Sequence, residues 1–317
     1  MSASRFPRSP FLSSNAAYHA VMRPDRFGLS VALATPFAED RSIDLPRLVA
    51  HARQSLADGC NSITAFGTTG EGASLGLNER QRALGALVGA GIDPATKLVV
   101  GIAASSVEDA IAQGRAGLML GCPSFLLAPP FYFKNPGDEG RFDWIAAVLR
   151  GLGPKASNVI LYHIPQVTAV GLSMALIERL KKAFPAQIKG VKDSSGDWDN
   201  AQALLKQHGD LHILIGDERL LARAMKLGAS GAITGLANVA PDLMRPLLDG
   251  VEEPRVNAMV EAVLPFAVTA AVKALVGHRR NDAAAWSRMR APLRSLGQAE
   301  CLELFAAIDA IRSRRAA

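Results

Sequence analysis

The stretch KLVVGIAASSVEDAIAQGRAGLMLGCPSFLLA, residues 97–128, decides the fold. It begins with an apolar, strand-like run at 97–102, continues with a helix-like segment at 107–120 and ends with a second apolar run at 124–128. Ser106 stands just before the helical segment, where a hydroxyl can cap the first turn. A strand, a helix and another strand in this order predict two parallel strands joined by a right-handed crossover.

The same unit recurs along most of the chain and predicts an α/β fold, a closed (β/α)8 TIM barrel over residues 29–250. Asp44, Asn78 and Ser173 are further helix start signals. Expected strands are 29–35, 62–66, 97–102, 124–128, 158–162, 188–192, 211–215 and 231–234, and expected helices are 45–57, 78–89, 107–120, 142–149, 174–184, 201–207, 220–227 and 241–248.

The two ends of the chain lie outside this repeat. Residues 251–317 read as a C-terminal helical extension, interrupted at Gly277 and Pro292, for which we expect a role in packing and assembly. Residues 1–28 have the serines and arginines of a transit peptide but no apolar signal core, so we interpret them as a disordered tail or an over-long start.

Composition indicates a soluble cytoplasmic protein. The chain has 317 residues, 49% of them hydrophobic, with no apolar run of the length that a membrane span requires. Cys60, Cys122 and Cys301 have no metal-ligand spacing, and we expect neither a disulfide nor a metal site. The net charge of +6 comes from dispersed basic residues, which argues against nucleic acid as a partner. The arginines of residues 278–294 are expected on helix faces or at subunit contacts.

Lys192 is the strongest candidate for a catalytic residue. It stands in the run IKGVKDSSG, residues 188–196, where an ammonium on an apolar strand is costly to desolvate. Burial favours the neutral amine, which can attack a ketone and form a Schiff base. Lys189 lies three residues upstream and should point to the other side of the strand.

Other chemical groups follow neighbouring strands. GTTGEG, residues 67–72, and LYHIP, residues 161–165, both stand at expected strand ends. Two of the three tyrosines in the chain, Tyr132 and Tyr162, lie where successive strands finish. The carboxyl ends of barrel strands meet at one mouth, where barrel enzymes carry their active sites. Adjacent strand residues alternate in direction, so His163 and Asp193 are expected to point away from an inward Tyr162 and Lys192.

Together these motifs resemble the pyruvate-dependent class I aldolases of the dihydrodipicolinate synthase and N-acetylneuraminate lyase family, over nearly the whole chain. The resemblance implies a TIM barrel that needs no cofactor and acts on pyruvate or a 2-keto acid and an aldehyde. It implies Lys192 as the Schiff-base residue and Tyr162 as acid and base. Thr69 and Tyr132 would complete a proton relay, with Tyr132 reaching over from a neighbouring subunit of a homodimer or homotetramer.

The resemblance also implies substrate contacts. Thr68 and Thr69 would hold the keto-acid carboxylate, with Ile233 beside it. Val167 stands where the synthases carry an arginine for the carboxylate of aspartate semialdehyde. Ser194, Asp217 and Glu218 match positions at which sialic acid lyases hold a polyol, and we expect them to bind substrate, although Gly235 replaces the final serine of that set.

The resulting hypothesis is a Schiff-base lyase or aldolase for a 2-keto-3-deoxy sugar acid. A 4-hydroxy-tetrahydrodipicolinate synthase of lysine biosynthesis is the alternative within the family. Two alternatives lie outside it: a phosphosugar-binding barrel, with residues 228–233 as the phosphate cradle, and a keto-acid-binding regulator without catalysis.

Overall fold

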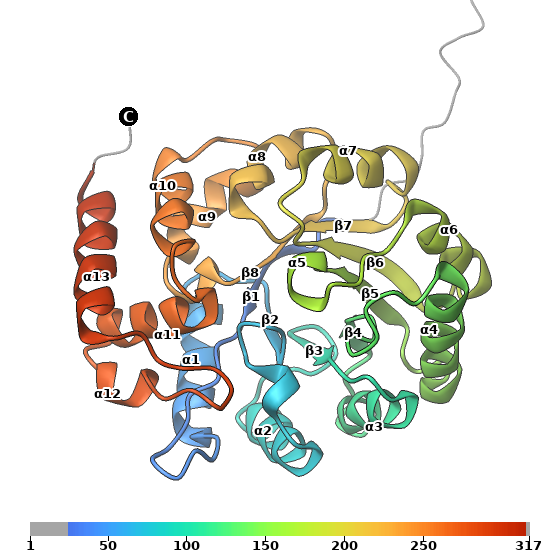
Figure 1. Cartoon of the computed structure of the whole chain (residues 1–317), viewed down its shortest axis with the longest axis horizontal. Coiled ribbons are helices and arrows are strands. Elements are labelled where there is room, and N and C mark those ends of the chain that lie inside the picture. The colour runs from blue at the N-terminus through green and yellow to red at the C-terminus, as the bar shows by residue number, and fades with distance from the viewer. Residues whose placement is uncertain (1–24, 315–317) are drawn as a thin grey trace, which may run out of the picture.

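The computed structural model describes residues 25–314, and eight parallel strands form its closed barrel. Each strand pairs with its neighbours in sequence, and β1 closes the circle on β8 (Figure 1). The predicted TIM barrel is therefore confirmed. The strands are β1 (Gly28–Ala32), β2 (Ser62–Ala65), β3 (Leu98–Ile102), β4 (Ser124–Leu127), β5 (Asn158–His163), β6 (Ile188–Asp193), β7 (His212–Ile215) and β8 (Gly231–Thr234).

Helices surround the barrel and cover its outer face (Figure 1). Within the described residues the longer ones of the barrel are α1 (Leu45–Ala57), α2 (Leu77–Gly89), α3 (Val107–Leu118), α4 (Asp138–Leu152), α6 (Met174–Ala183), α7 (Trp198–Gln207), α8 (Glu218–Lys226) and α9 (Pro241–Leu248). Three short helical turns, which the sequence pattern did not predict, follow strands: η1 (Gly72–Ser74), α5 (Pro165–Thr168) and η2 (Leu236–Asn238).

Helix starts follow the predicted capping with one exception. The side chains of Asp44, Ser106 and Ser173 accept backbone hydrogen bonds at the first turns of α1, α3 and α6. Asn78 is not a cap, because α2 already begins at Leu77 and its cap residue is Gly76.

The C-terminal residues form α10 (Pro254–Val263), α11 (Val268–Arg279), α12 (Ala283–Trp286) and α13 (Gln298–Ser313). The predicted break at Gly277 is wrong: this glycine lies inside α11, where a Cβ would stand 2.9 Å from Ala283 Cα of α12. Its lack of a side chain serves close helix packing rather than helix termination. The break at Pro292 is confirmed, since residues 287–297 are not helical.

Residues 1–24 lie outside the described residues, so the expectation of a disordered tail stays a prediction for them. For residues 25–28 it is wrong, because Phe27 N donates to Ser230 O and Gly28 belongs to β1. No single described helix is long and apolar enough to cross a bilayer; α10 and α11 meet that test only together, across a 116° bend.

The barrel holds two apolar layers. One large cluster fills the space between strands and helices, and a smaller one lies inside the barrel. The interior cluster includes Ile160, Tyr162, Leu214 and Ile233, so these side chains face one another across the barrel.

The alternative of a phosphate cradle at 228–233 does not fit the fold. Residues 228–230 precede β8 and therefore lie at the amino end of that strand, opposite the mouth where barrel phosphate sites form. Gly231 instead allows a tight strand contact, with φ of +149° and an ideal Cβ 2.1 Å from Gly28 O.

We expect Gly231→Ala to destabilise the protein by about 2–4 kcal/mol, because it adds backbone strain and a clash with the β1 backbone at the barrel closure. Gly85→Ala is the control, since that glycine lies inside α2 with no atom within 4 Å of a Cβ, and it should stabilise by about 0.5–1 kcal/mol. Urea denaturation of both variants measures the difference. A Gly231→Ala protein as stable as the parent would contradict this account of the closure.

Candidate active site

Lys192 and Tyr162 meet inside the barrel. They are Cα partners on the adjacent strands β6 and β5, and each side chain is almost fully buried. Lys192 Nζ donates to Tyr162 Oη over 3.2 Å and lies 4.3 Å from the centre of the ring. Lys189 points elsewhere, because its Nζ donates to Pro185 O on the exposed side. Of these two lysines, Lys192 is the one that contacts the phenol of Tyr162.

An irregularity in strand pairing creates this contact. Val159 pairs with Ile188, but the next residue, Ile160, pairs with Gly190, so Lys189 is passed over. Without that shift Tyr162 would face Val191 rather than Lys192. Because a one-residue change of register exchanges the two faces of a strand, the bulge turns Lys192 into the barrel.

The loop of residues 67–70 follows β2 and is tightly folded. Phe66 and Glu71, on either side of it, both have positive φ angles, 62° and 54°. A Cβ on Gly72 would stand 1.8 Å from Phe66 O, so only glycine fits there. Non-glycine residues with such backbone angles are costly and concentrate at functional sites.

Thr68, not Thr69, makes the polar contact from this loop. Thr68 Oγ1 lies 3.4 Å from Tyr162 Oη, whereas Thr69 Oγ1 is directed to Gly235, 3.4 Å from the place of a Cβ there. The expected role of Thr69 in a proton relay stays a prediction. Consecutive residues of a tight turn project in different directions, and the sequence does not reveal which of two threonines faces the phenol.

The surroundings of Tyr162 favour proton transfer. Burial alone would raise the pKa of its phenol, but the positive charge of Lys192 and hydrogen bonds from Thr68, Lys192 and Ser194 act in the opposite direction and lower that pKa below its usual value of 10.0. A phenol with a lowered pKa gives up its proton more readily near neutral pH.

Tyr132 lies away from this cluster. Its side chain is 71% exposed and packs edge-on against the ring of Phe133, which is 73% exposed. Both belong to the loop between β4 and α4. Its expected role in a partner's site stays a prediction.

Two of the residues expected to bind a polyol, Asp217 and Glu218, accept hydrogen bonds from other residues of the chain. Asp217 caps α8, and its two oxygens accept from Arg219 Nε at 3.0 Å and Nη2 at 2.7 Å. Glu218 is buried and accepts from Leu236 N, and burial raises its pKa. Ser194 follows β6, and Gly216 leaves room for its hydroxyl, which would lie 2.0 Å from a Cβ there.

Three further residues are placed by strand alternation. Ile233 points into the barrel and is fully buried there. His163 Nδ1 accepts from Leu172 N at 3.0 Å, and the carboxylate of Asp193 accepts from Ser195 N and Asn200 Nδ2, each at 2.9 Å. His163 and Asp193 thus point away from the barrel interior, as the alternation predicts.

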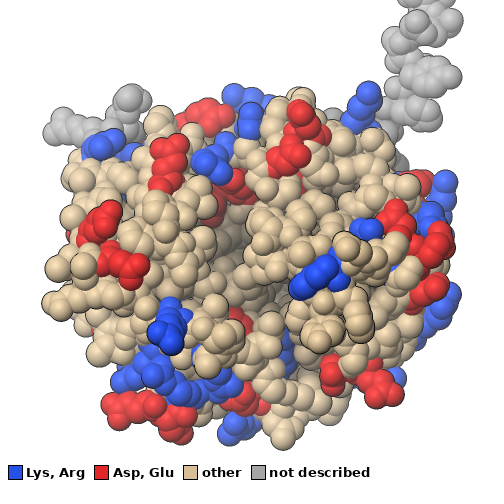
Figure 2. Space-filling model, viewed as in Figure 1, with Lys and Arg blue, Asp and Glu red and all other residues tan. Residues whose placement is uncertain are grey.

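A cavity of about 420 Å³ opens above Tyr162. Figure 2 shows a hollow near the middle of this face, bordered mostly by uncharged residues. Lys192 is not part of the wall and contacts it through Tyr162. The wall consists of Phe66, Gly67, Thr68, Glu71, Gly72, Ala73, Ser74, Gly101, Ile102, Ala103, Leu126, Ala128, Phe131, Tyr162, Ile164, Val167, Thr168, Thr269, Ala291, Pro292 and Leu293.

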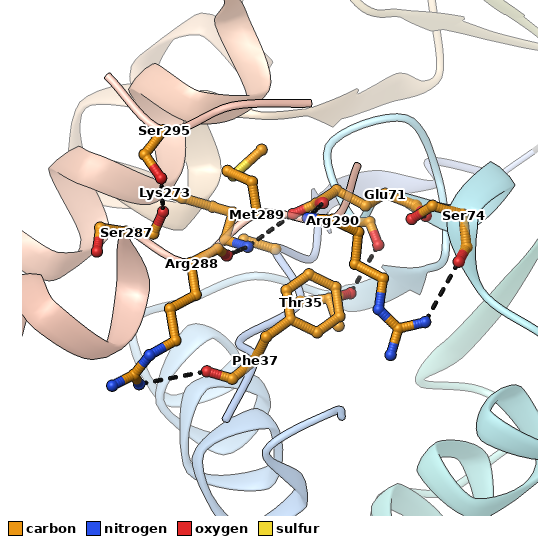
Figure 3. A network of polar contacts seen from close by, with 12 residues as sticks. Thr35, Phe37, Glu71, Ser74, Lys273, Ser287, Arg288, Met289, Arg290 and Ser295 are labelled. Atoms are coloured by element: carbon orange, nitrogen blue, oxygen red, sulfur yellow. Dashed lines mark hydrogen bonds and ion pairs between the residues drawn. The ribbon is translucent and has the colours of Figure 1, made fainter. Parts of the chain in front are cut away.

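A buried ion pair connects this wall to the C-terminal helices (Figure 3). Lys273 Nζ of α11 lies 2.6 Å from Glu71 Oε1, and neither side chain is exposed. The other carboxylate oxygen accepts from Arg290 N at 2.9 Å, and Lys273 also donates to Arg288 O at 2.5 Å. Burial lowers the pKa of Lys273 even beside Glu71. The cost of removing both charges from water therefore offsets much of their attraction, and the pair fixes the position of residues 288–290 more than it stabilises the fold.

This network was not predicted from the sequence. Lys273 is a single lysine among apolar residues of α11, the same signal that marked Lys192. The extension was expected to serve packing and assembly only, but Ala291, Pro292 and Leu293 belong to the cavity wall. Arg288 and Arg290 do not lie on a helix face, since their segment is not helical, and they pair with Glu39 and Glu79 of the same chain.

A closed barrel with a buried lysine and tyrosine below a cavity at the strand ends defines an enzyme-like (β/α)8 protein. Comparison with known proteins identifies it further. The model of the Dihydrodipicolinate synthetase family matches residues 25–280, and the chain belongs to this family. It is a family of lyases, and we regard the chain as a lyase.

Three relatives indicate the range of similarity. A DapA-like lyase of Chloroflexus aurantiacus is 33% identical over 90% of this chain and 96% of its own. A 4-hydroxy-tetrahydrodipicolinate synthase of Corynebacterium urealyticum is 32% identical over 74% of this chain and 76% of its own. The crystal structure of a dihydrodipicolinate synthase from Agrobacterium tumefaciens has 47% identity and a TM-score of 0.88, covering 90% of this chain and 99% of the other.

We expect Lys273→Met to destabilise the protein by about 3–5 kcal/mol, because it leaves the Glu71 carboxylate buried without its cation. The double variant Glu71→Gln/Lys273→Met should lose clearly less, since no buried charge remains and the glutamine carbonyl can still accept from Arg290 N. Chemical denaturation of the two single variants and the double variant measures the coupling. Additive losses would show that the two charges do not depend on each other.

Proposed function

We propose that this protein is a class I aldolase or lyase in which Lys192 forms a Schiff base with pyruvate or a related 2-keto acid. The observation that carries the proposal is the 3.2 Å hydrogen bond between Lys192 Nζ and Tyr162 Oη. It pairs a nucleophile with an acid and base within reach of the same carbonyl. Membership of a lyase family supports the same conclusion.

The chemistry follows from these groups. The neutral amine of Lys192 adds to the keto carbon, and the carbinolamine loses water to an iminium as Tyr162 supplies a proton to the departing hydroxyl. The Tyr162 phenolate then takes a proton from the adjacent methyl and gives an enamine, whose carbon attacks an aldehyde and forms one carbon–carbon bond. The aldehyde oxygen takes that proton from Tyr162 and becomes a hydroxyl, and water then releases the product from Lys192. The cleavage direction reverses each step.

The positions of Thr68, Thr69 and Ile233 support their proposed roles in proton transfer and keto-acid binding. Thr68 Oγ1 is 3.4 Å from Tyr162 Oη and would pass protons between the phenol and the mouth. The backbone amides and hydroxyls of Thr68 and Thr69 would hold the carboxylate of the keto acid in the tight loop. Ile233 would pack beside the bound keto acid from the barrel interior.

A 4-hydroxy-tetrahydrodipicolinate synthase is the second candidate, favoured by the 47% identity to the Agrobacterium protein that bears the synthase name. Against it stands Val167, because valine cannot pair with the carboxylate of aspartate semialdehyde. Loss of such a charge-assisted contact costs about 1.5–3 kcal/mol, or roughly ten- to a hundredfold in recognition. The alternative of a keto-acid-binding regulator differs from both enzyme candidates, since it requires keto-acid binding without turnover.

Borohydride reduction in the presence of pyruvate should attach one reduced pyruvate to Lys192, because hydride converts an iminium into a stable amine. Intact mass and peptide mapping check the site, and Lys192→Ala should remove the adduct. Lys189→Ala is the matched control and should retain it. An adduct on Lys189, or none on the parent protein, would refute the Schiff-base proposal.

We further propose a homodimer or homotetramer in which Tyr132 serves a neighbouring subunit, as its exposure on the β4–α4 loop allows. Tyr132→Phe and Lys192→Ala should each be inactive, since each removes one part of every site. Mixing them after subunit exchange should restore activity, because some mixed sites contain both an intact lysine and an intact tyrosine. If exchange is proven by mass and activity stays absent, Tyr132 does not act across subunits.

A further inference from the structure

We propose that the aldehyde half of the substrate is uncharged and apolar, of the aryl or branched-alkyl class, and that residues 291–293 and Val167 select it. This inference rests on the proposed function, since it concerns the second reactant of the same site. It is an alternative to the sugar-acid half that the resemblance implies.

The cavity wall offers no charge to a substrate. Among the described residues, its one ionisable group besides Tyr162 is Glu71. That carboxylate is fully buried, and its oxygens accept from Lys273 Nζ and Arg290 N. Asp217 and Glu218 are not part of the wall. A carboxylate on the aldehyde would enter without a cation partner, which is costly in a buried site.

Two backbone carbonyls of the wall are also occupied. Arg80 lies behind the wall, 1% exposed, and its guanidinium donates to Gly101 O at 2.8 Å and to Gly72 O at 2.6 Å. It also lies 5.1 Å from the centre of the Phe66 ring. Arg80 therefore consumes acceptors that a polyol would otherwise use, while its own charge stays outside the cavity.

The wall hydroxyls divide into three groups. Thr168 Oγ1 bonds within its own turn to Ile164 O and Val170 O, and Ser74 Oγ donates to Glu71 O. Thr68 and Tyr162 lie at the end near Lys192, where the keto acid reacts. Only Thr269 remains among the wall hydroxyls away from that end. The hydroxyls of a sugar chain would lose water and find few partners.

Apolar side chains make up the rest of the cavity. Phe131 and Ile164 come from the loops after β4 and β5, Val167 comes from the short helix α5, and Ala291, Pro292 and Leu293 come from the segment before α13. The Glu71–Lys273–Arg290 contacts hold that segment in place (Figure 3). A volume of about 420 Å³ falls in the range of small-molecule sites, which are largely apolar with a few polar groups at the reacting end.

The test is a set of parallel aldol reactions with pyruvate and one of three aldehydes: benzaldehyde, D-glyceraldehyde or aspartate semialdehyde. With benzaldehyde the enamine carbon joins the aldehyde carbon, and 4-hydroxy-2-oxo-4-phenylbutanoate forms with no other product. We expect kcat/KM for benzaldehyde to exceed that for each of the other two by about tenfold or more. Liquid chromatography with mass detection measures the products.

Val167→Arg is the matched variant, chosen because Val167 is 58% exposed and tolerates a long side chain. It should shift the ratio of kcat/KM for benzaldehyde to that for aspartate semialdehyde by about tenfold toward the semialdehyde. Val167→Leu keeps an apolar wall and should preserve the ratio of the parent. Borohydride trapping with pyruvate measures imine formation in each variant, independently of its reaction with the aldehyde.

The outcomes separate the two proposals. Trapping at Lys192 combined with better use of glyceraldehyde or the semialdehyde than of benzaldehyde would overturn the apolar aldehyde and leave the Schiff-base function standing. Absence of trapping would overturn both. We expect a trapped adduct at Lys192 and preferred use of benzaldehyde. The ratio of kcat/KM values should shift in Val167→Arg but not in Val167→Leu.

Discussion

The pairing of β5 with β6 is the constraint on which the rest of the site depends. Ordinary pairing would continue from Val159 and Ile188 and bring Val191 beside Tyr162. The bulge at Lys189 advances β6 by one residue, which places Lys192 inside the barrel and Asp193 outside it. Every proposed step of catalysis requires that inward amine, and the lowered pKa of Tyr162 depends on it as well.

A second constraint lies in the loop after β2. Phe66 and Glu71 have strained backbone angles, and contacts from elsewhere in the chain hold the loop in this conformation. Thr35 Oγ1 donates to Gly70 O at 2.7 Å, and Lys273 pairs with the Glu71 carboxylate. Strained backbone persists only where its surroundings over-determine it. The C-terminal helices therefore stabilise the position of the loop that carries Thr68, although they stand outside the barrel.

The sequence predicted the barrel well because strand and helix periodicities are local signals. Asp44, Ser106 and Ser173 begin helices as their side chains suggest, and Lys192 and Tyr162 lie together inside. The sequence could not reveal contacts that are non-local. The contact of Thr68 with Tyr162 and the pairing of Lys273 with Glu71 each depend on a side chain that only the folded chain brings near. Gly277 shows the same limit, because a glycine inside a helix resembles a terminator until its neighbour α12 is known.

The origin of the cavity wall has an evolutionary consequence. The amine that we propose to react belongs to a barrel strand, whereas Ala291, Pro292 and Leu293 come from an irregular segment far along the chain that no strand register constrains. Substitutions in that segment can change which second reactant is accepted without altering the bulge that orients Lys192. A duplicated gene of this architecture can therefore acquire a new partner specificity by drift in one loop while it keeps its bond-forming chemistry intact.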